Sequence, residues 1–239
     1  YEKGSSHPKG TKVSERTVIL SSARTPIGKL GGALSSVTAP ELGSTAIRAA
    51  IDRAYIDAND VDYVIMGNVL SAGLGQAPAR QASIGAGLPE TCSALTVNKV
   101  CASGIMSIIL ASLVVQSGDA DVVVAGGMES MSRAPHVLSG SRPGKNVDNR
   151  KLVDTMVHDG LWCCFNDTHM GNLAEGTAME FEVSRQEQDL FALSSHRNAV
   201  RATGDGSFSE EIVPVNIGTR DTNAIVVKDE GPRPDTSIA

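Results

Sequence analysis

The stretch Asn98-Lys99-Val100-Cys101-Ala102-Ser103-Gly104 decides the fold, because a β-branched run ends there and an apolar helix begins. Residues 94–97 predict a buried strand, and the mostly apolar residues 105–115 predict a helix. We therefore expect Cys101 at or just inside the helix N-terminus, where free N–H groups and the helix dipole stabilise an anion. A thiol placed there ionises more easily than a free cysteine, and its thiolate is a nucleophile. The alternative interpretation is a buried structural cysteine, the usual state of this residue type.

The segments around this stretch predict alternating strands and helices. Strands are expected at residues 17–22, 61–69, 94–97 and 121–125, and helices at 40–56, 78–86 and 105–115. This order is typical of an α/β protein. Loops of glycine and small polar residues follow Val69, Val97 and Ala125. Because ligands bind at the carboxyl ends of strands in open α/β sheets, we expect these three loops to converge.

The pattern changes near residue 133. Residues 134–151 are rich in Gly, Pro, Ser, Asn and basic side chains, and a capping box at Ser184-Arg185-Gln186-Glu187 opens a later helix. Further expected elements are helices at 154–160 and 170–181, short strands at 212–215 and 224–227, and an unstructured, unpacked end at 229–239. We divide the chain into an unstructured end at 1–16, an incomplete α/β domain at 17–132 and a loop domain at 133–239.

Composition excludes several classes of protein. The chain has 239 residues, 41% of them hydrophobic and 3% aromatic, which suits helices packed closely on a sheet. Its net charge of −6 provides no basic field, so we expect no nucleic-acid partner. We see no apolar stretch that approaches a membrane span and expect no membrane partner. The four cysteines show no CxxC spacing, which predicts neither a disulfide framework nor a metal site. Reduced thiols point to the cytoplasm or the mitochondrial matrix rather than to secretion.

Other candidate motifs are weaker. Gly126-Gly127 lacks the spacing of a phosphate loop, so a turn with close backbone approach is the better interpretation. His169 is a candidate hydrogen-bonding group in a ligand site, although a lone histidine is more often structural. Arg220, Lys228 and Arg233 form an ordinary solvated face unless the ligand is anionic. No histidine or second cysteine stands in an obvious partner motif for Cys101, so the catalytic machinery is incomplete from the residues alone.

Taken together, these residues resemble the thiolase family over residues 17 to about 236. The resemblance is carried by ordered stretches: Ser22-Ala23-Arg24-Thr25-Pro26-Ile27-Gly28, Gly75-Gln76-Ala77-Pro78-Ala79-Arg80-Gln81, Asn98-Lys99-Val100-Cys101-Ala102-Ser103-Gly104, Ala125-Gly126-Gly127-Met128-Glu129-Ser130-Met131-Ser132 and His169-Met170-Gly171. It implies a thiolase-like fold, with helices on a mixed five-stranded sheet and a loop domain that covers coenzyme A.

The resemblance also implies an activity. Cys101 accepts an acyl group as a thioester, in a Claisen condensation of two acetyl-CoA to acetoacetyl-CoA and in the reverse thiolysis. Leu161, His169 and Met170 resemble the pocket for pantetheine and a short acyl group, and Arg233 is a candidate for the nucleotide phosphates. The substrates are coenzyme A thioesters, with no cofactor and no metal, and family members form homodimers or homotetramers.

The sequence also departs from the family pattern. The histidine that activates the nucleophile, the second cysteine and the Asn-containing oxyanion site belong to a carboxy-terminal half whose motifs are absent here. We therefore expect this polypeptide alone to be inactive or nearly so. The alternatives are a degradative 3-ketoacyl-CoA thiolase, a non-catalytic module that binds acyl-CoA or lipid, and, remotely, a β-ketoacyl-carrier synthase.

Overall fold

A small parallel sheet forms the centre of the fold. The computed structural model describes residues 17–140, 151–218 and 224–238, so the end expected at 1–16 lies outside the described residues. Within this part of the chain, three parallel strands lie in the order β2-β1-β3. Their bounds are Tyr63–Gly67 for β1, Ser93–Val97 for β2 and Val123–Gly127 for β3. The expected α/β class is confirmed, but these residues form a three-stranded parallel sheet rather than a mixed five-stranded one.

Helices cover both faces of β1, the central strand. Successive side chains of a strand point to opposite faces. Val64 and Met66 join a buried cluster with residues of α1 (Ala39–Ala54) and α2 (Pro78–Gly85). Ile65 is equally buried outside this cluster, and Gly67 lies against Ser103 at the start of α3 (Ser103–Ser117). The continuous apolar run of β1 follows from this burial on both sides.

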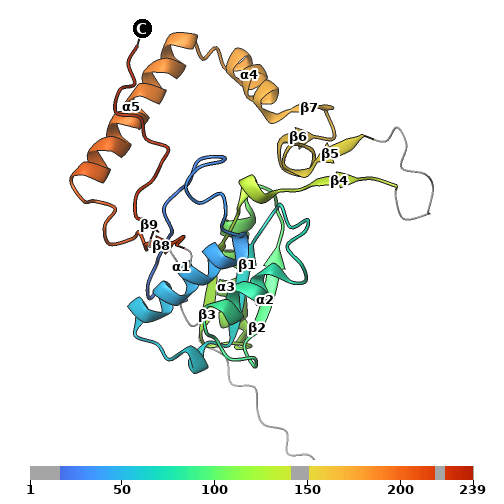
Figure 1. The fold of residues 1–239 in the computed structure, drawn as a ribbon, viewed down its shortest axis with the longest axis vertical. Coiled ribbons are helices and arrows are strands. Elements are labelled where there is room, and N and C mark those ends of the chain that lie inside the picture. Colours follow the sequence, from blue (N-terminus) through green and yellow to red (C-terminus); the bar gives the residue numbers. More distant parts are fainter. Residues whose placement is uncertain (1–16, 141–150, 219–223, 239) are drawn as a thin grey trace, which may run out of the picture.

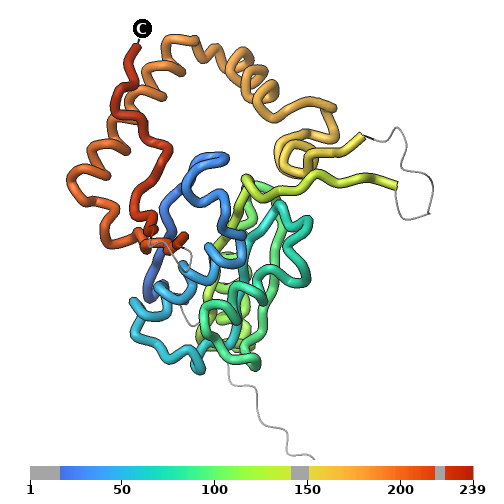
Figure 2. The backbone as a smooth tube through the Cα atoms, viewed as in Figure 1, coloured from blue at the N-terminus to red at the C-terminus, as the bar shows by residue number. Residues whose placement is uncertain are grey.

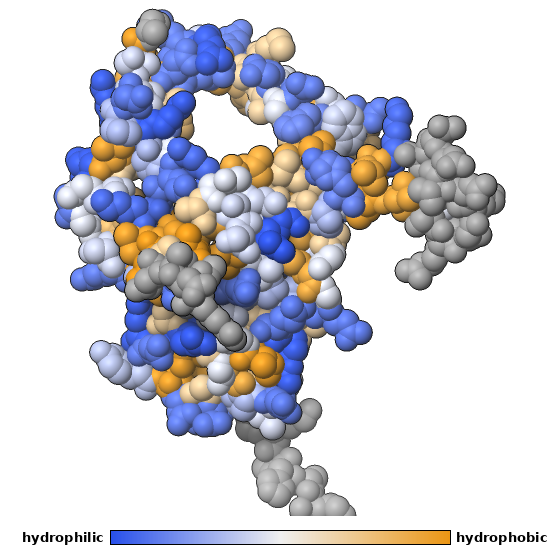
Figure 3. All heavy atoms as spheres, viewed as in Figure 1, coloured by the Kyte–Doolittle hydropathy of each residue, from blue (hydrophilic) through white to orange (hydrophobic). Residues whose placement is uncertain are grey.

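The rest of the chain is built of short elements with little core. Two 3₁₀ turns, η1 (Ala58–Asp60) and η2 (Met131–Arg133), lie before β1 and after β3. Beyond η2, strands β4 to β9 form antiparallel pairs. The elements are β4 His136–Leu138, β5 Leu152–Asp154, the π-helix η3 Met156–Leu161, β6 Trp162–Cys163, β7 Thr168–His169, α4 Met170–Glu180, α5 Arg185–Gly204, β8 Val215–Asn216 and β9 Ile225–Val226. Helices α4 and α5 form an arch that stands away from the sheet (Figures 1 and 2). In the space-filling view the arch borders an opening (Figure 3).

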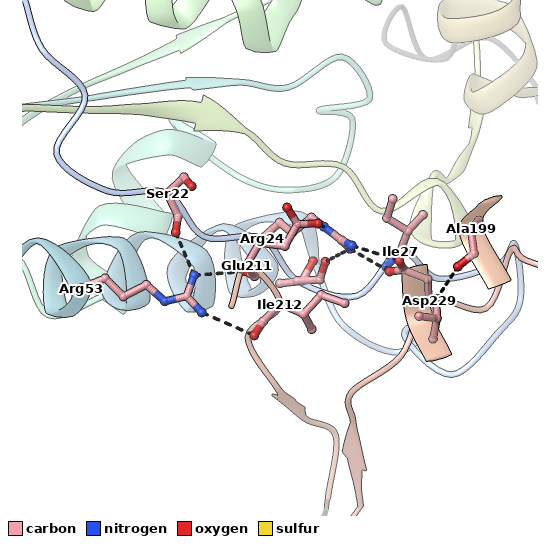
Figure 4. Close-up of polar contacts among 10 residues, drawn as sticks. Ser22, Arg24, Ile27, Arg53, Ala199, Glu211, Ile212 and Asp229 are labelled. Carbon is pink, nitrogen blue, oxygen red and sulfur yellow. Dashed lines mark hydrogen bonds and ion pairs between the residues drawn. The ribbon is translucent and has the colours of Figure 1, made fainter. Parts of the chain in front are cut away.

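The end of the chain returns to the N-terminal segment and is fastened there. The Arg24 guanidinium donates to both carboxylate oxygens of Asp229, at 2.8 and 3.0 Å, and to Glu211 at 2.7 Å (Figure 4). The next residue, Glu230, accepts hydrogen bonds from the backbone N–H groups of Lys29 and Ala33. The expectation that residues 229–239 lack packing is therefore wrong, because two carboxylates in this stretch find fixed donors. The domain boundary at 132/133 stays a prediction.

The strand expected at 17–22 is also absent. These residues form no ladder with any described strand, and Val18, Ile19 and Leu20 are 62–83% exposed. The nearest pairing is a single bridge between Arg24 and Ile212. A β-branched run becomes a strand only where a neighbouring edge offers hydrogen-bond partners, and sequence pattern alone does not supply one.

The apolar segment that contains α3 is longer than the sequence analysis predicts. The 18-residue window Val100–Ser117 has a mean hydropathy of 1.9, so it meets the length and composition of a membrane span. In this structure 17% of the window is buried. The expectation that no stretch approaches that length was wrong. The core helix of a water-soluble protein can pass the same test, and α3 packs Ser107 and Ala111 toward the sheet.

Candidate active site

The carboxyl ends of the three parallel strands converge on one cavity, as the sequence predicts. The cavity has a volume of about 340 Å³. Its walls come from the ends of β1 and β3 and from the turn between β2 and α3: Gly67, Asn68, Val69, Val100, Cys101, Ser103, Gly104, Gly127, Met128 and Glu129. The strand-end rule for α/β sheets therefore places these segments correctly.

Cys101 is exposed and lines this cavity. The interpretation as a buried structural cysteine is therefore wrong, whereas Cys92, at 2% exposure, is the buried thiol. The first helical residue is Ser103 and the N-cap is Ala102, so Cys101 lies just before the helix rather than inside it. The expectation of an easily ionised thiol at Cys101 stays a prediction.

The residue before Cys101 has a backbone conformation that is rare for its type. Val100 has a φ of +50°, in the left-handed region that a β-branched residue avoids. Such a conformation costs about 1–3 kcal/mol and persists only where surrounding contacts enforce it. Those contacts come from two neighbouring side chains. Asn98 Oδ1 accepts from Val100 N at 3.0 Å, while Ser103 Oγ accepts from Lys99 N and donates to Val100 O at 2.6 Å.

A glycine on β1 lets this turn approach the sheet closely. A Cβ on Gly67 would lie 2.6 Å from the Ser103 carbonyl carbon and 2.8 Å from Gly104 N. Both are backbone atoms that cannot rotate away. The start of α3 therefore sits against β1 at a distance that only glycine permits, which holds the Cys101 turn over the strand ends.

A half-buried carboxylate forms another wall of the cavity. Glu129 accepts hydrogen bonds from Val69 N at 2.9 Å, Leu70 N at 3.1 Å and Asn68 Nδ2 at 2.8 Å. Burial raises the pKa of Glu129, although these three donors act in the opposite direction. Asn68 is 1% exposed, and its Oδ1 has no hydrogen-bond partner among the described residues. The sequence analysis gave neither residue a role, although a carboxylate just after a strand-end glycine pair was a usable signal.

A second set of predicted residues is brought together by the β6–β7 hairpin. Leu161 ends η3, and the next residue, Trp162, pairs with His169. His169 caps α4 by accepting from Gly171 N at 3.0 Å through Nδ1, and the half-buried Met170 begins the helix. Gly160, the residue before Leu161, packs against Leu70, since a Cβ at this glycine would lie 3.2 Å from the Leu70 side chain. None of these three predicted residues lines the Cys101 cavity.

Arg233 lies apart from both groups, beside His196 of α5. Its backbone N–H donates to His196 Nδ1 at 3.2 Å, and its guanidinium lies 3.3 Å from His196 Nε2. Arg233 is therefore not simply a solvated side chain, while Arg220, assigned with it, lies outside the described residues. The structure places Arg233 beside a histidine that the sequence reading treated as solvated.

The site presents one exposed thiol, Cys101, and its described lining includes no histidine or second cysteine. No group of three or more potential metal ligands occurs among residues 17–140, 151–218 and 224–238. What the arrangement can do by itself is present an accessible thiol at the mouth of α3, facing a cavity at the strand ends.

Comparison with known proteins gives a consistent result. The family model "Thiolase, N-terminal domain" matches residues 17–239. A probable acetyl-CoA acetyltransferase of Escherichia coli is 51% identical over 92% of this chain and 56% of its own length. An acetyl-CoA acetyltransferase of Cupriavidus necator is 52% identical over 88% and 54%, and a probable acetyl-CoA acyltransferase of Staphylococcus aureus is 49% identical over 93% and 57%.

The chain spans about half the length of these curated relatives. Identity near 50% extends over about nine-tenths of the chain. With a family model that covers residues 17–239 and a cysteine at the meeting point of three strand ends, this chain belongs to the thiolase family.

Proposed function

We propose that this chain supplies the acyl-accepting cysteine of an acetyl-CoA C-acetyltransferase. The observation that carries the proposal is the exposed Cys101 thiol on a cavity of about 340 Å³ at the carboxyl ends of three parallel strands. The relatives named acetyl-CoA acetyltransferase support the choice of acetyl groups. The substrates are acetyl-CoA and acetoacetyl-CoA, and no further cofactor is needed.

The proposed chemistry begins with the Cys101 thiolate. The sulfur attacks the thioester carbonyl carbon of acetyl-CoA, an S–C bond forms, and the bond to the coenzyme A sulfur breaks. The coenzyme A thiolate then takes up a proton, so charge and atoms balance. The backbone N–H groups at the start of α3 favour the anionic sulfur before the attack. In the second step a base from outside this cavity takes a proton from the methyl group of another acetyl-CoA. The carbanion attacks the acyl carbon on Cys101, so a C–C bond forms, the S–C bond breaks, and Cys101 leaves as a thiolate with acetoacetyl-CoA as the product.

The coenzyme A contacts are part of the same proposal. Leu161, His169 and Met170 lie together around the β6–β7 hairpin and form the pantetheine end of the site. With Nδ1 of His169 occupied by the helix cap, Nε2 is free to face the ligand. Arg233, fixed beside His196, meets the nucleotide phosphates. We further propose a homodimer or homotetramer located in the cytoplasm or the mitochondrial matrix, without a membrane or nucleic-acid partner.

Turnover needs groups that this chain does not bring to the cavity. General bases and oxyanion donors each contribute two or more orders of magnitude to such reactions. We therefore expect the 239-residue chain to accept label at Cys101 but to show almost no thiolysis of acetoacetyl-CoA. Full turnover by this chain would contradict that expectation.

The direct test compares two reactions at the same thiol. Bromoacetyl-CoA should alkylate Cys101 at a rate that saturates with reagent concentration and falls when free coenzyme A competes. The exposed Cys164 serves as a reference thiol on the same molecule, read by peptide mass spectrometry. A C101S chain should lose only the saturable label. Equal, non-saturating labelling of Cys101 and Cys164 would overturn the proposal.

A degradative 3-ketoacyl-CoA thiolase is the second candidate, because one relative is named as an acyltransferase. Competition against the bromoacetyl-CoA reaction separates the two. Protection by acetoacetyl-CoA alone supports the acetyltransferase, and equal protection by a long-chain 3-ketoacyl-CoA supports the broader enzyme. Saturable binding of acyl-CoA without any label at Cys101 identifies a non-catalytic binding module instead.

A further inference from the structure

The turn before Cys101 is held by hydrogen bonds from the side chains of Asn98 and Ser103. Val100 stands in the left-handed region, where most β-branched residues relax to a negative φ. The strand β2 ends at Val97 and α3 starts at Ser103, so the direction of the chain changes within a few residues. A backbone conformation this unfavourable persists only where nearby contacts enforce it. Here the hydrogen bonds of the Asn98 and Ser103 side chains do so.

Two side chains bond three successive peptide groups around Val100. Asn98 Oδ1 receives the Val100 N–H at 3.0 Å, which is an Asx turn. Ser103 is 5% exposed, and its hydroxyl joins Lys99 N, at 2.8 Å, to Val100 O, at 2.6 Å. With its φ positive, Val100 thereby has both its N–H and its carbonyl bonded, the carbonyl also by the backbone N–H of Ser103 at 3.0 Å.

The consequence is the direction of the next residue. Ser103 is nearly buried against Gly67, whereas Cys101, two residues earlier, is exposed on the cavity wall. We propose that Asn98 and Ser103 are positioning residues, which hold Val100 in its left-handed conformation and so turn the Cys101 thiol into the cavity. This inference rests on the proposed role of Cys101, but its test does not require acyl transfer.

The test measures alkylation of the full 239-residue chain by iodoacetamide, resolved for each cysteine by mass spectrometry. Cys164 reports reagent activity and Cys92 reports the fold, because the first is exposed and the second is buried. Labelling is done at about pH 9.5, above the ordinary cysteine pKa of about 8.5, so that most thiols are ionised. The added charge of a variant such as N98D then changes the thiolate fraction little. The measured quantity is the ratio of the Cys101 rate to the Cys164 rate.

We expect N98A to lower this ratio about tenfold. That is the effect of losing roughly one hydrogen bond between uncharged groups, which in the original chain offsets the strain at Val100. N98D retains the acceptor for Val100 N and should stay within about twofold of the original chain. V100G removes the cost of the positive φ, so V100G alone should preserve the ratio. The N98A/V100G chain should recover most of what N98A loses, because the turn no longer needs its clamp.

The double variant separates positioning from general destabilisation. An unchanged ratio in N98A, or a ratio in N98A/V100G as low as in N98A, would overturn the inference. If N98A also exposes Cys92 to labelling, the double variant decides: a protected Cys92 with a restored ratio supports positioning, and an exposed Cys92 contradicts it. Saturable labelling by bromoacetyl-CoA is scored separately, so failure of the acyltransferase proposal is distinguishable from failure of the positioning role.

Discussion

At the scale of single residues, the site depends on where side chains are missing as much as on where they are present. Gly67 allows the backbone of Ser103 and Gly104 to lie against β1. Val100 shows the opposite case, because a side chain is present where glycine would fit better. Its left-handed φ is unfavourable for valine but freely adopted by glycine. The position of the Cys101 thiol therefore follows from backbone geometry on both sides of the strand-to-helix turn.

A G67A substitution tests this close approach. The added methyl would lie 2.6 Å from a backbone carbon that cannot move aside, so we expect the free energy of unfolding to fall by about 3 kcal/mol. G126A is the matched control, because its Cβ would meet no atom closer than 3.5 Å, and its effect should stay within about 0.5 kcal/mol. Urea unfolding measures both. Equal destabilisation by the two substitutions would contradict the packing argument.

At the scale of elements, the helices differ in how much they bury. α1 and α5 begin with the same capping box, Thr38 with Glu41 and Ser184 with Glu187. Yet α1 buries Ile47 and Ile51 in the main core, whereas α5 buries only Leu193 among its described side chains. The same local interaction should therefore contribute to global stability in one helix and to local order in the other.

Removing each N-cap hydroxyl separates these two effects. We expect T38A to lower the global free energy of unfolding by about 1 kcal/mol, because α1 forms part of the cooperative core. We expect S184A to leave the global value unchanged and to speed amide hydrogen exchange in the first turn of α5 about fivefold. Urea unfolding and exchange mass spectrometry check the pair. A global loss of similar size for S184A would show that α5 unfolds with the core.

At the scale of the whole molecule, one arginine fastens the end of the chain to its beginning. Arg24 bonds Asp229 through two parallel hydrogen bonds and lies 5.1 Å from the centre of the Phe208 ring. Arg53 adds bonds to the carbonyl oxygens of Ser22, Glu211 and Ile212 (Figure 4). The closed path from the sheet through α4 and α5 and back depends on these contacts (Figure 2).

An R24Q substitution should release the returning segment. Loss of a bidentate pair with a largely buried carboxylate costs about 2 kcal/mol, so we expect local opening to increase about thirtyfold. Limited proteolysis within residues 206–238 measures this opening. R185Q is the control, because it breaks an Arg–Asp pair on the exposed face of α5 and should change cleavage little. Unchanged cleavage in R24Q would remove Arg24 from this role.

The same contact predicts a dependence on acid. Burial acts to raise the pKa of Asp229, but the Arg24 guanidinium and the Ile27 N–H outweigh it, and the net pKa lies below the ordinary value of 3.8. The stabilisation is therefore fully present above that value and is lost as the pH falls through the lower, folded-state pKa. We expect cleavage of residues 206–238 to rise below about pH 4 in the original chain, and D229N to abolish this rise.

The sequence by itself determined the features that depend on neighbours along the chain. The apolar period and Pro40 predicted a helix at 40–56, which the structure has at 39–54. The β-branched and apolar runs predicted the three parallel strands, and strand-end logic predicted their shared cavity. The same logic singled out Cys101, because a strand-to-helix turn is visible in residue pattern alone. Local propensity and spacing carry this information before any tertiary contact forms.

Only the tertiary structure decided the features that depend on distant partners. The run at 17–22 has strand propensity but pairs with no described edge, and Asp229 and Glu230 look unstructured until Arg24 and the loop at 27–33 meet them. The close approach of α3 to Gly67 and the partial burial of Glu129 likewise arise from segments brought near by folding. Strand pairing, backbone approach and carboxylate burial are all set by which groups come close in space, and residue order does not state that.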